Sequence, residues 1–311
     1  MRVLFWGTPE FAAAPLRALL GEGFEVAGVV TQPDKPQGRS REMVAPPVKR
    51  IALEENIPVF QPAKPRDEEF QEMITVMEPD ISVVVAYGHI LPWKVIDLPK
   101  LGTLNIHASL LPALRGAAPI QAAIKQGLSE TGVSIMRMVP ALDAGPVILQ
   151  APTKILDDET YGELQLRLSE LGALTLIEAL ALMSLGEGPE TAQDDSLATY
   201  ASKVTRDDAK IDWNQSPVEV SRTIRAYDPK PGAFTTLRGT DVKLFGPKPF
   251  TSDDGSDTEP GKVLSTTGAI TIACARGTVT ISDVQPAGRS RMTAGEWARG
   301  RGISVGDIFG E

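Results

Sequence analysis

Apolar and polar positions change in blocks along the first part of the chain. Short, nearly continuous apolar runs predict strands that are covered on both faces. Such runs occupy residues 2–6, 25–31 and 80–86. Apolar residues at helical spacing fill the intervals between them, over residues 9–20, 48–55 and 68–78. Strands that alternate with helices predict a parallel sheet with right-handed crossovers, so we expect a Rossmann-like α/β domain.

The pattern changes after residue 160. A long helical pattern covers 161–185, where Leu164, Leu168, Leu171 and Leu174 predict a stripe that packs into the core. A polar stretch broken by Gly188 and Pro189 follows. Short apolar runs then recur between turns, at 233–237, 242–245, 262–264, 270–273 and 278–284. Such runs are typical of a small antiparallel β-barrel, here of the OB-like, oligonucleotide-binding type. We expect domains at 1–189 and 209–311, joined by a linker at 190–208.

Composition adds limits to this picture. At 311 residues the chain is longer than one hydrophobic core usually supports, which agrees with two domains. Its single cysteine, Cys274, cannot form an internal disulfide, and we expect a cytoplasmic protein. No apolar run approaches the ~20 residues of a membrane span, so no membrane association is expected. The opening apolar run, up to Trp6, is too short for a signal peptide and predicts the first strand.

The net charge of −9 argues against nucleic-acid binding by the whole surface, but the charge is uneven. Residues 1–208 carry 18 basic and 28 acidic side chains, and residues 209–311 carry 13 and 12. Within the acidic part, the Pro-rich segment 34–50 is basic, with Lys35, Arg39, Arg41, Lys49 and Arg50 against Asp34 and Glu42. It is either a place where a phosphate backbone docks or simply a solvated loop.

Three polar side chains stand where predicted strands end. Asn105 and His107 are two residues apart on a strand that begins near Gly102, so both leave the same face. Asp143 follows a second strand pattern at 132–138 and precedes the Gly145–Pro146 break. Open α/β sheets bind their ligands outside the carboxyl ends of strands. We therefore expect Asn105, His107 and Asp143 to converge.

An amide, an imidazole and a carboxylate provide an orienting donor, a group that stabilises an oxyanion and a proton acceptor. The chain has only two histidines, His89 and His107, so imidazole chemistry has few possible sites. The plain alternative is that His107 is a hydrogen-bonded residue at a strand end and Asp143 a turn residue. For His89 we favour a surface or helix-start position over a catalytic role.

Two cofactor classes are disfavoured and one ligand class is favoured. The turn after the first strand, Gly7–Phe11, lacks the G-x-G-x-x-G spacing for a pyrophosphate, which argues against NAD or flavin. The chain has no metal-ligand cluster, so no metal is expected. The end of the 80–86 strand, at Tyr87–Pro92, suits a flat apolar ligand such as a pterin, with backbone groups of Ile90 and Leu91 reading its edge.

These residues resemble the methionyl-tRNA formyltransferase family over nearly the whole chain. The matching segments are 5–11, 31–34 with the basic loop, 84–88, 105–107, 109–112, 115–121, 142–145 and 285–288. Asn105, His107 and Asp143 are similar to the set of formyltetrahydrofolate-using enzymes of this fold in general. The basic loop and the second domain are what favour a tRNA. Ala113–Leu114 departs from the family, which often has a basic and an aromatic residue there.

The resemblance implies transfer of the formyl group of 10-formyltetrahydrofolate to the α-amine of methionine on initiator tRNA, by a monomer without metal or NAD. Asn105, His107 and Asp143 would be catalytic. His107 and the Asn105 amide would stabilise the oxyanion, while Asp143 holds His107 and helps to remove the amine proton. The folate would lie against Tyr87, Ile90, Leu91 and the turn Ser109, Leu110, Leu111 and Pro112. Lys35, Arg39 and Arg41 would contact the tRNA.

The barrel domain would bind the rest of the tRNA. Its basic face is expected from Arg222, Arg225, Lys230, Lys243, Arg289 and Arg291. Three alternatives stay open. One is a related enzyme that formylates a sugar amine or a nucleotide precursor, or hydrolyses the folate. Another is a tRNA-binding protein without activity. The third, a dinucleotide-dependent oxidoreductase, is disfavoured by the missing glycine fingerprint.

Overall fold

A computed structural model describes residues 1–37, 42–251 and 258–310. The chain forms two compact units. Unit 1 comprises residues 1–119, 130–154 and 165–201, and unit 2 comprises residues 120–129, 155–164 and 202–311. Each unit is therefore built from segments that are distant in the sequence, and each is described by itself below.

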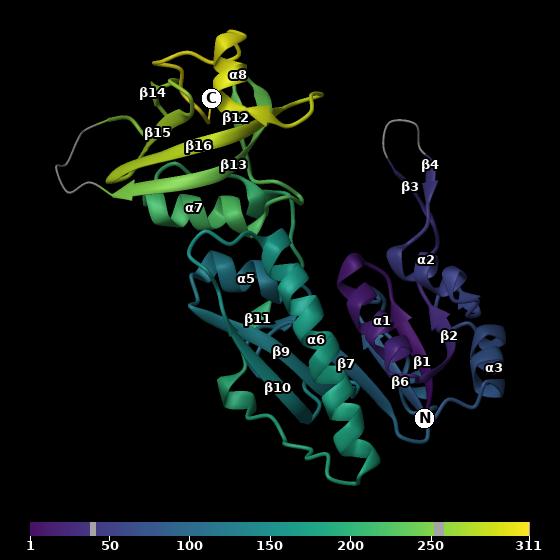
Figure 1. Cartoon of the computed structure of the whole chain (residues 1–311). Coiled ribbons are helices and arrows are strands. Elements are labelled where there is room, and N and C mark those ends of the chain that lie inside the picture. Colours follow the sequence, from purple (N-terminus) through teal and green to yellow (C-terminus); the bar gives the residue numbers. More distant parts are fainter. Residues whose placement is uncertain (38–41, 252–257, 311) are drawn as a thin grey trace. The chain divides into compact units, whose positions relative to one another are not determined.

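Unit 1 is built on a seven-stranded sheet in the order β10-β9-β7-β6-β1-β2-β5 (Figure 1). The strands are β1 (Arg2–Gly7), β2 (Glu25–Val30), β5 (Val59–Phe60), β6 (Ile81–Val85), β7 (Thr103–His107), β9 (Glu130–Arg137) and β10 (Val147–Lys154). Neighbouring strands are parallel from β5 to β7. Strand β9 is antiparallel to both of its neighbours, β7 and β10. The predicted Rossmann-like α/β domain is confirmed, with the continuous apolar runs as its central strands.

Helices and smaller elements complete unit 1. The helices are η1 (Glu10–Ala12), α1 (Ala13–Gly21), α2 (Pro47–Glu54), α3 (Glu68–Val76), α4 (Trp93–Ile96), α6 (Tyr161–Ser184), which begins in unit 2, and η2 (Asp195–Leu197). Two small pairs lie beside the main sheet, β3 (Lys35–Gln37) with β4 (Glu42–Val44) and β8 (Arg115–Gly116) with β11 (Tyr200–Ala201). No described helix is long and apolar enough to span a membrane.

Residues on opposite faces of the sheet pack against different helices. On one face, Trp6 is fully buried and makes edge-on contacts with Phe70 of α3 and with Tyr87. On the other face, Gly172 of α6 comes so close to Ile106 of β7 that an added Cβ would lie 2.9 Å from the Ile106 side chain. Because side chains alternate along a strand, Asn105 and His107 leave β7 on the face opposite α6.

The stripe predicted on α6 needs a correction. Leu164 and Leu168 are fully buried, but Leu174 is 70% exposed. The buried positions instead continue through Gly172 and Leu176 at a spacing of four residues. Four residues exceed one helical turn only slightly, so this row stays on one face, whereas Leu174 has turned toward solvent.

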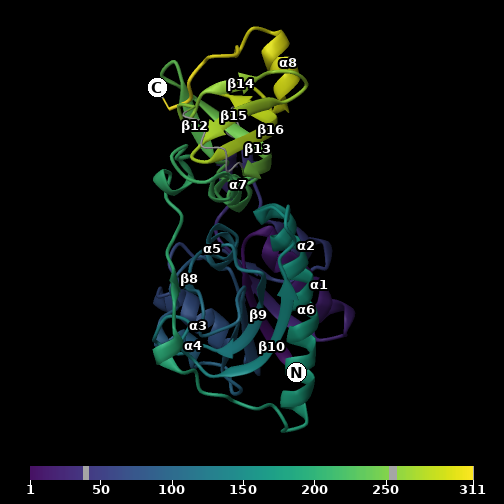
Figure 2. The same ribbon diagram turned by 90° about the vertical axis from the view of Figure 1, so that its left-hand side faces the viewer.

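Unit 2 contains a six-stranded antiparallel sheet with β12-β13-β16-β15-β14 as its main path and β17 paired with β16 (Figure 2). The strands are β12 (Phe234–Leu237), β13 (Thr240–Thr251), β14 (Val263–Ser265), β15 (Ile270–Cys274), β16 (Gly277–Pro286) and β17 (Met292–Thr293). The helices are α5 (Pro119–Gln126), whose first residue belongs to unit 1, η3 (Asp207–Ala209), α7 (Pro217–Ala226) and α8 (Ala294–Arg299). The expected antiparallel OB-like domain is confirmed.

The last described residues tie together the two ends of this sheet. Val263 of β14 donates to the Asp307 carbonyl at 2.8 Å, and Gly310 donates to the Thr236 carbonyl of β12 at 2.9 Å. Between these two bonds, Phe309 is buried and stacks on Trp213. The tail thus satisfies backbone groups on both edge strands, which closes the curled sheet without a further strand.

Strand β13 is longer than the sequence pattern predicts, because it continues through Pro247 and Pro249. Beyond Leu244, whose nitrogen donates to the Ala233 carbonyl, its only partner strand among the described residues is β16. A proline cannot donate to a neighbouring strand, and it is tolerated where one side of a strand has no partner. The two prolines therefore argue against a strand in the local sequence, although pairing with β16 on one side permits it.

Candidate active site

The two polar residues of β7 lie at the centre of the unit 1 sheet. Asn105 pairs with Val84 of β6 and with Met136 of β9, and His107 pairs with Ser134 of β9. His107 is 5% exposed, whereas Asn105 is half-buried. The flanking Leu104 and Ile106 are buried on the opposite face, and they fix the register that presents both polar side chains on one side.

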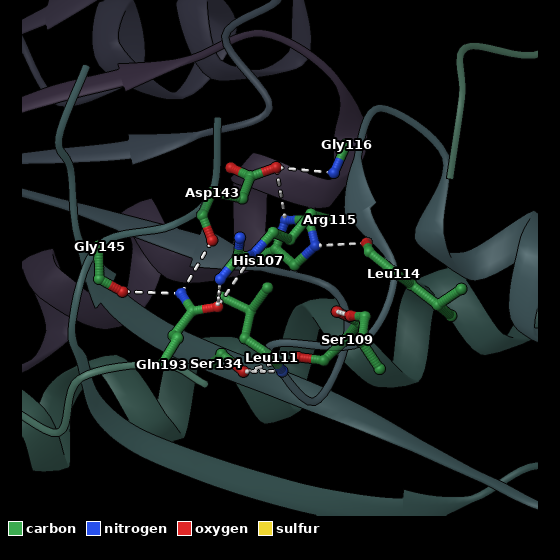
Figure 3. A network of polar contacts seen from close by, with 11 residues as sticks. His107, Ser109, Leu111, Leu114, Arg115, Gly116, Ser134, Asp143, Gly145 and Gln193 are labelled. Atoms are coloured by element: carbon green, nitrogen blue, oxygen red, sulfur yellow. Dashed lines mark hydrogen bonds and ion pairs between the residues drawn. The ribbon is translucent and has the colours of Figure 1, made fainter. Parts of the chain in front are cut away.

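The ring of His107 is held by a backbone carbonyl. Its Nε2 lies 2.9 Å from the Leu114 oxygen, and its Nδ1 lies 3.7 Å from Oδ2 of Asp143 (Figure 3). A carbonyl only accepts hydrogen bonds, so Nε2 carries the hydrogen. In the neutral ring the lone pair therefore sits on Nδ1, on the side of Asp143. Protonation would place a positive N–H there, facing the carboxylate.

Asp143 is held in a tight loop between β9 and β10. Its φ is +49°, and its Oδ2 accepts a hydrogen bond from the Gly116 nitrogen at 2.8 Å. Gly145, two residues later, has no room for a side chain, because an added Cβ would lie 1.9 Å from the Arg137 carbonyl oxygen. The loop thus requires a glycine at 145 and aims the Asp143 carboxylate at His107. The predicted approach of Asp143 to His107 is observed.

The turn from Ser109 to Pro112 is anchored to β9 and β10. The Ser134 hydroxyl donates to the Ser109 carbonyl at 2.7 Å and accepts from the Leu111 nitrogen at 3.1 Å. The Gln150 amide donates to the Leu111 carbonyl at 2.9 Å. The Ser109 hydroxyl itself donates to the Ala113 carbonyl, and the Leu111–Pro112 peptide is cis. Side chains of the sheet therefore hold this turn in one position.

A cavity of about 320 Å³ lies beside this turn in unit 1. It is lined by Leu111, Pro112, residues 147–150 of β10 and residues 191–194. Its volume lies within the range of small-molecule sites. Leu111 and Pro112 thus border a hollow, and Leu110 is half-buried in the same turn.

The residues after β6 have different surroundings. The Tyr87 and Leu91 side chains are buried in the core around Trp6, whereas Ile90 is 93% exposed. Burial raises the pKa of Tyr87 to about 12. The Tyr87 carbonyl accepts from the side chains of Thr8 and Gln32, at 3.1 and 3.3 Å. A ligand at this strand end would meet the Ile90 side chain and backbone groups, whereas the Tyr87 ring stays in the core.

The basic loop is only partly described. Lys35 is exposed at the start of β3, and Arg39 and Arg41 lie outside the described residues. Lys49 bonds to both carboxylate oxygens of Asp34 at 2.8 Å and to Gln61 at 2.9 Å. Hydrogen bonds from Lys49 and Gln61 lower the pKa of Asp34. The charge of Lys49 is therefore balanced at the base of the loop.

Comparisons with known proteins cover nearly the whole chain. A model of the formyl transferase family matches residues 1–180, and a model of the formyl transferase C-terminal domain matches residues 203–302. A protein of Methylococcus capsulatus named methionyl-tRNA formyltransferase is 44% identical over 98% of this chain and 98% of its own length. The chain belongs to the methionyl-tRNA formyltransferase family.

Other relatives and solved structures agree with this family. A methionyl-tRNA formyltransferase of Geobacter sulfurreducens is 42% identical, over 100% of this chain and 97% of its own length. HypX from Aquifex aeolicus, solved in complex with tetrahydrofolic acid, has a TM-score of 0.69 at 20% identity, over 95% of this chain and 46% of HypX. An N-formyltransferase from Helicobacter canadensis has a TM-score of 0.68 at 16% identity, over 91% of this chain and 98% of that chain. At such identities these two structures share the fold.

Several site residues were missed by the sequence analysis. Arg115 is 3% exposed and binds Gln193 and Asp195, and Gln193 in turn binds the loop that carries Asp143 (Figure 3). Arg115 stands in a motif shared with the methionyl-tRNA formyltransferase family, which was a usable signal. Gln193 lies in a polar linker, where the hydrophobic pattern gives no signal of a functional residue. The Leu114 carbonyl and the Gly116 nitrogen are backbone groups, which residue types do not reveal.

Proposed function

We propose that this protein transfers the formyl group of 10-formyltetrahydrofolate to the α-amine of methionine on initiator tRNA. The observation that carries this function is the similarity to named methionyl-tRNA formyltransferases over both units, at 41–44% identity. Proteins that share only the α/β domain would support formyl transfer without naming the acceptor. The named methionyl-tRNA formyltransferases match the second unit as well, which favours the tRNA acceptor. We expect a monomer that acts in the cytoplasm.

Catalysis is assigned to Asn105, His107 and Asp143. The neutral amine attacks the formyl carbon as a nucleophile. A tetrahedral intermediate with a negative oxygen forms as the new C–N bond is made. The Asn105 amide is the group assigned to this oxygen, since a side-chain donor aimed at a developing charge lowers the barrier. It lies two residues before His107 on the same face of β7.

His107 is assigned the transfer of the proton from the amine to the folate nitrogen. Because Nε2–H donates to Leu114, the free lone pair is on Nδ1, which is able to accept the amine proton directly or through water. The resulting imidazolium faces Asp143, 3.7 Å away, and this carboxylate stabilises it. The same proton then passes to the folate nitrogen as its bond to the formyl carbon breaks. This differs from the expectation that His107 holds the oxyanion, and the Leu114 contact is the reason.

The folate is assigned to the hollow beside Ser109–Pro112 and to the end of β6. Leu111 and Pro112 line the cavity of about 320 Å³. At the end of β6, the exposed Ile90 side chain and the backbone groups of Tyr87 and Leu91 are assigned to the same ligand. The Ser109 hydroxyl and the Leu110 side chain belong to the same turn, which the hydrogen bonds of Ser134 and Gln150 support.

The tRNA is assigned to the basic loop and to unit 2. Lys35 is exposed, and Arg39 and Arg41 follow it in the sequence. In unit 2, Lys230 and Arg289 are exposed. Three of the other expected basic residues are less free. Arg225 donates to the Glu159 carbonyl, Lys243 to the Pro231 carbonyl, and Arg291 stacks on Phe245.

The decisive test is a formylation assay with purified protein and 10-formyltetrahydrofolate, run with each of two acceptors and once without any acceptor. Charged initiator tRNA should become formylated, as mass spectrometry of the released amino acid would report, and a sugar-nucleotide amine should not. Formylation of the sugar amine alone would identify a sugar formyltransferase instead. Release of formate without any acceptor would identify a hydrolase.

A further inference from the structure

The side-chain amide of Gln193 joins two parts of the active site. Its Oε1 accepts hydrogen bonds from Nε and Nη2 of Arg115, at 3.0 and 2.8 Å. Its Nε2 donates to the carbonyl oxygens of Asp143 at 2.8 Å and Gly145 at 2.7 Å. Figure 3 shows the amide between the loop and Arg115. An amide offers two hydrogens and two acceptor positions, so this side chain is fully engaged.

The Arg115 side of the contact with Gln193 is held in place by further bonds. The Arg115 guanidinium is 3% exposed and also bonds to Oδ1 of Asp195 at 2.8 Å. A buried charge must be paired, so the guanidinium holds its partners firmly. The backbone of Arg115 is fixed as well, because its nitrogen donates to the Thr199 carbonyl in the β8–β11 pair. Gln193 therefore connects the Asp143 loop to an anchored arginine.

Asp143 is held at two points, by Gly116 of β8 and by Gln193, which is bound to the adjacent Arg115. Gly116 donates to its carboxylate, while Gln193, held by Arg115, donates to its carbonyl. The residue has a positive φ of 49°, a conformation that side-chain-bearing residues adopt rarely and that surrounding contacts must maintain. Loss of the Gln193 donors would free this loop and let the carboxylate move away from His107.

We propose that Gln193 is a positioning residue for formyl transfer, which holds Asp143 in the orientation that faces His107. This inference rests on the proposed role of Asp143. It also assigns a task to a segment that lies between the two family-model matches, which end at residue 180 and resume at 203. The segment 191–201 is thus a working part of the catalytic unit.

The test compares the wild type with Gln193→Glu and Gln193→Ala in steady-state formylation. Glu keeps the size and the acceptor for Arg115 but removes the donors to Asp143 and Gly145, and Ala removes the donors without adding charge. Both variants should lose kcat by about 10- to 100-fold, the effect of a small misplacement of a catalytic group. Gln193 borders the cavity assigned to folate, but its amide is fully occupied by Arg115, Asp143 and Gly145. The KM values for folate and tRNA should therefore change by less than about threefold.

Gln71→Glu on α3 is the matched control, since it makes the same chemical change outside the network and should keep wild-type kcat. Circular dichroism should show that all variants are folded. A raised folate KM with unchanged kcat would overturn the proposal, because Gln193 would then contact the ligand. Loss of activity in Gln193→Glu but not in Gln193→Ala would also overturn it, because the added charge alone would be responsible.

A double-mutant cycle separates this inference from the role of Asp143. If Gln193 acts through Asp143, then Gln193→Glu should cause no further loss of kcat in an Asp143→Asn background. Multiplied losses would show an independent role and refute the proposal. Normal turnover in Asp143→Asn alone would remove Asp143 from the mechanism. A slow Asp143→Asn enzyme beside a normal Gln193→Glu enzyme would leave the mechanism intact and reject only Gln193.

Discussion

At the scale of single residues, backbone groups decide what the active-site side chains do. His107 has one nitrogen committed to the Leu114 carbonyl, and Asp143 has one oxygen committed to the Gly116 nitrogen. The ring keeps Nδ1 free, and the carboxylate oxygen that faces it, Oδ2, is the one that the Gly116 nitrogen holds. The chemistry assigned to the site follows from this pair of atoms. The changed side chains at Ala113 and Leu114 leave the His107 contact in place, because it uses only the backbone.

Replacement of each assigned catalytic residue tests this account. Asn105→Ala, His107→Ala and Asp143→Asn should each lower kcat by roughly 10²- to 10⁴-fold, the range of a lost general base or oxyanion donor. Binding of tRNA, measured by filter retention, should stay within about threefold of wild type. His89→Ala is the matched control, because His89 is exposed and should be dispensable. Near-normal turnover in any of the three variants would exclude that residue from the mechanism.

Cys274 permits a pH prediction at the same scale. Burial raises the pKa of its thiol to about 12 from 9.0. The folded protein therefore favours the neutral thiol, so stability is full below pH 9 and falls as the pH rises from about 9 toward 12, where only the unfolded chain ionises.

At pH 8.5, thiol-modifying reagents should label the folded protein far more slowly than the denatured protein, because the thiolate is the reactive species. Ellman's reagent measures both rates. Equal rates would mean that the Cys274 strand opens freely.

At the scale of elements, residues 307–310 at the end of unit 2 take the place of an additional strand. Residues 307–310 bond to β14 and β12, and Phe309 fills the space over Trp213 with ring centroids 5.8 Å apart. Open edge strands invite association with other chains, so this closure also protects the sheet. The sequence pattern predicts no element in this segment.

Phe309→Ala should therefore destabilise unit 2 by about 3–5 kcal/mol, the usual cost of removing a buried aromatic side chain. Thermal unfolding followed by tryptophan fluorescence would report the loss, because Trp213 is the stacking partner. Val305→Ala, at a position that is 62% exposed, is the control and should leave the unfolding midpoint nearly unchanged. An equal midpoint for both variants would mean that the tail is not part of the folded unit.

At the scale of the whole molecule, the compact units differ from contiguous domains. Unit 2 includes residues 120–129 and 155–164, and contacts such as Gly162 N–H to the Asp228 carbonyl and Lys125 to the Asp208 carbonyl hold these segments to it. A cut near residue 209 would leave them without their partners. Substitutions in the intact chain are therefore the better way to test tRNA binding.

Replacing Lys35, Arg39 and Arg41 together by alanine should weaken tRNA binding and flatten its salt dependence. Each phosphate contact contributes roughly 0.7–0.9 to the slope of log K against log salt, so three contacts would remove roughly 2.1–2.7. Titrations at several salt concentrations measure this slope. Lys100→Ala, another exposed lysine, is the control. An unchanged slope in the triple variant would exclude the loop as a phosphate contact.

Much of this protein is determined by its sequence alone. Continuous apolar runs predicted β1, β2 and β6 because buried parallel strands need apolar side chains on both faces. Alternation along β7 predicted that Asn105 and His107 share a face, which is a local property of any strand. The resemblance carried by the short motifs predicted the family, which the comparisons confirm.

Only the tertiary structure decided which distant groups meet. The Gln193 amide bonds to Arg115, which is 78 residues away, and to the Asp143 carbonyl, which is 50 residues away. Segments 120–129 and 155–164 join unit 2 rather than the domain that precedes it in the chain. Periodicity reports which face of one element is buried, whereas these contacts depend on how several elements pack. A polar linker residue and a backbone carbonyl therefore gain their roles only in the folded chain.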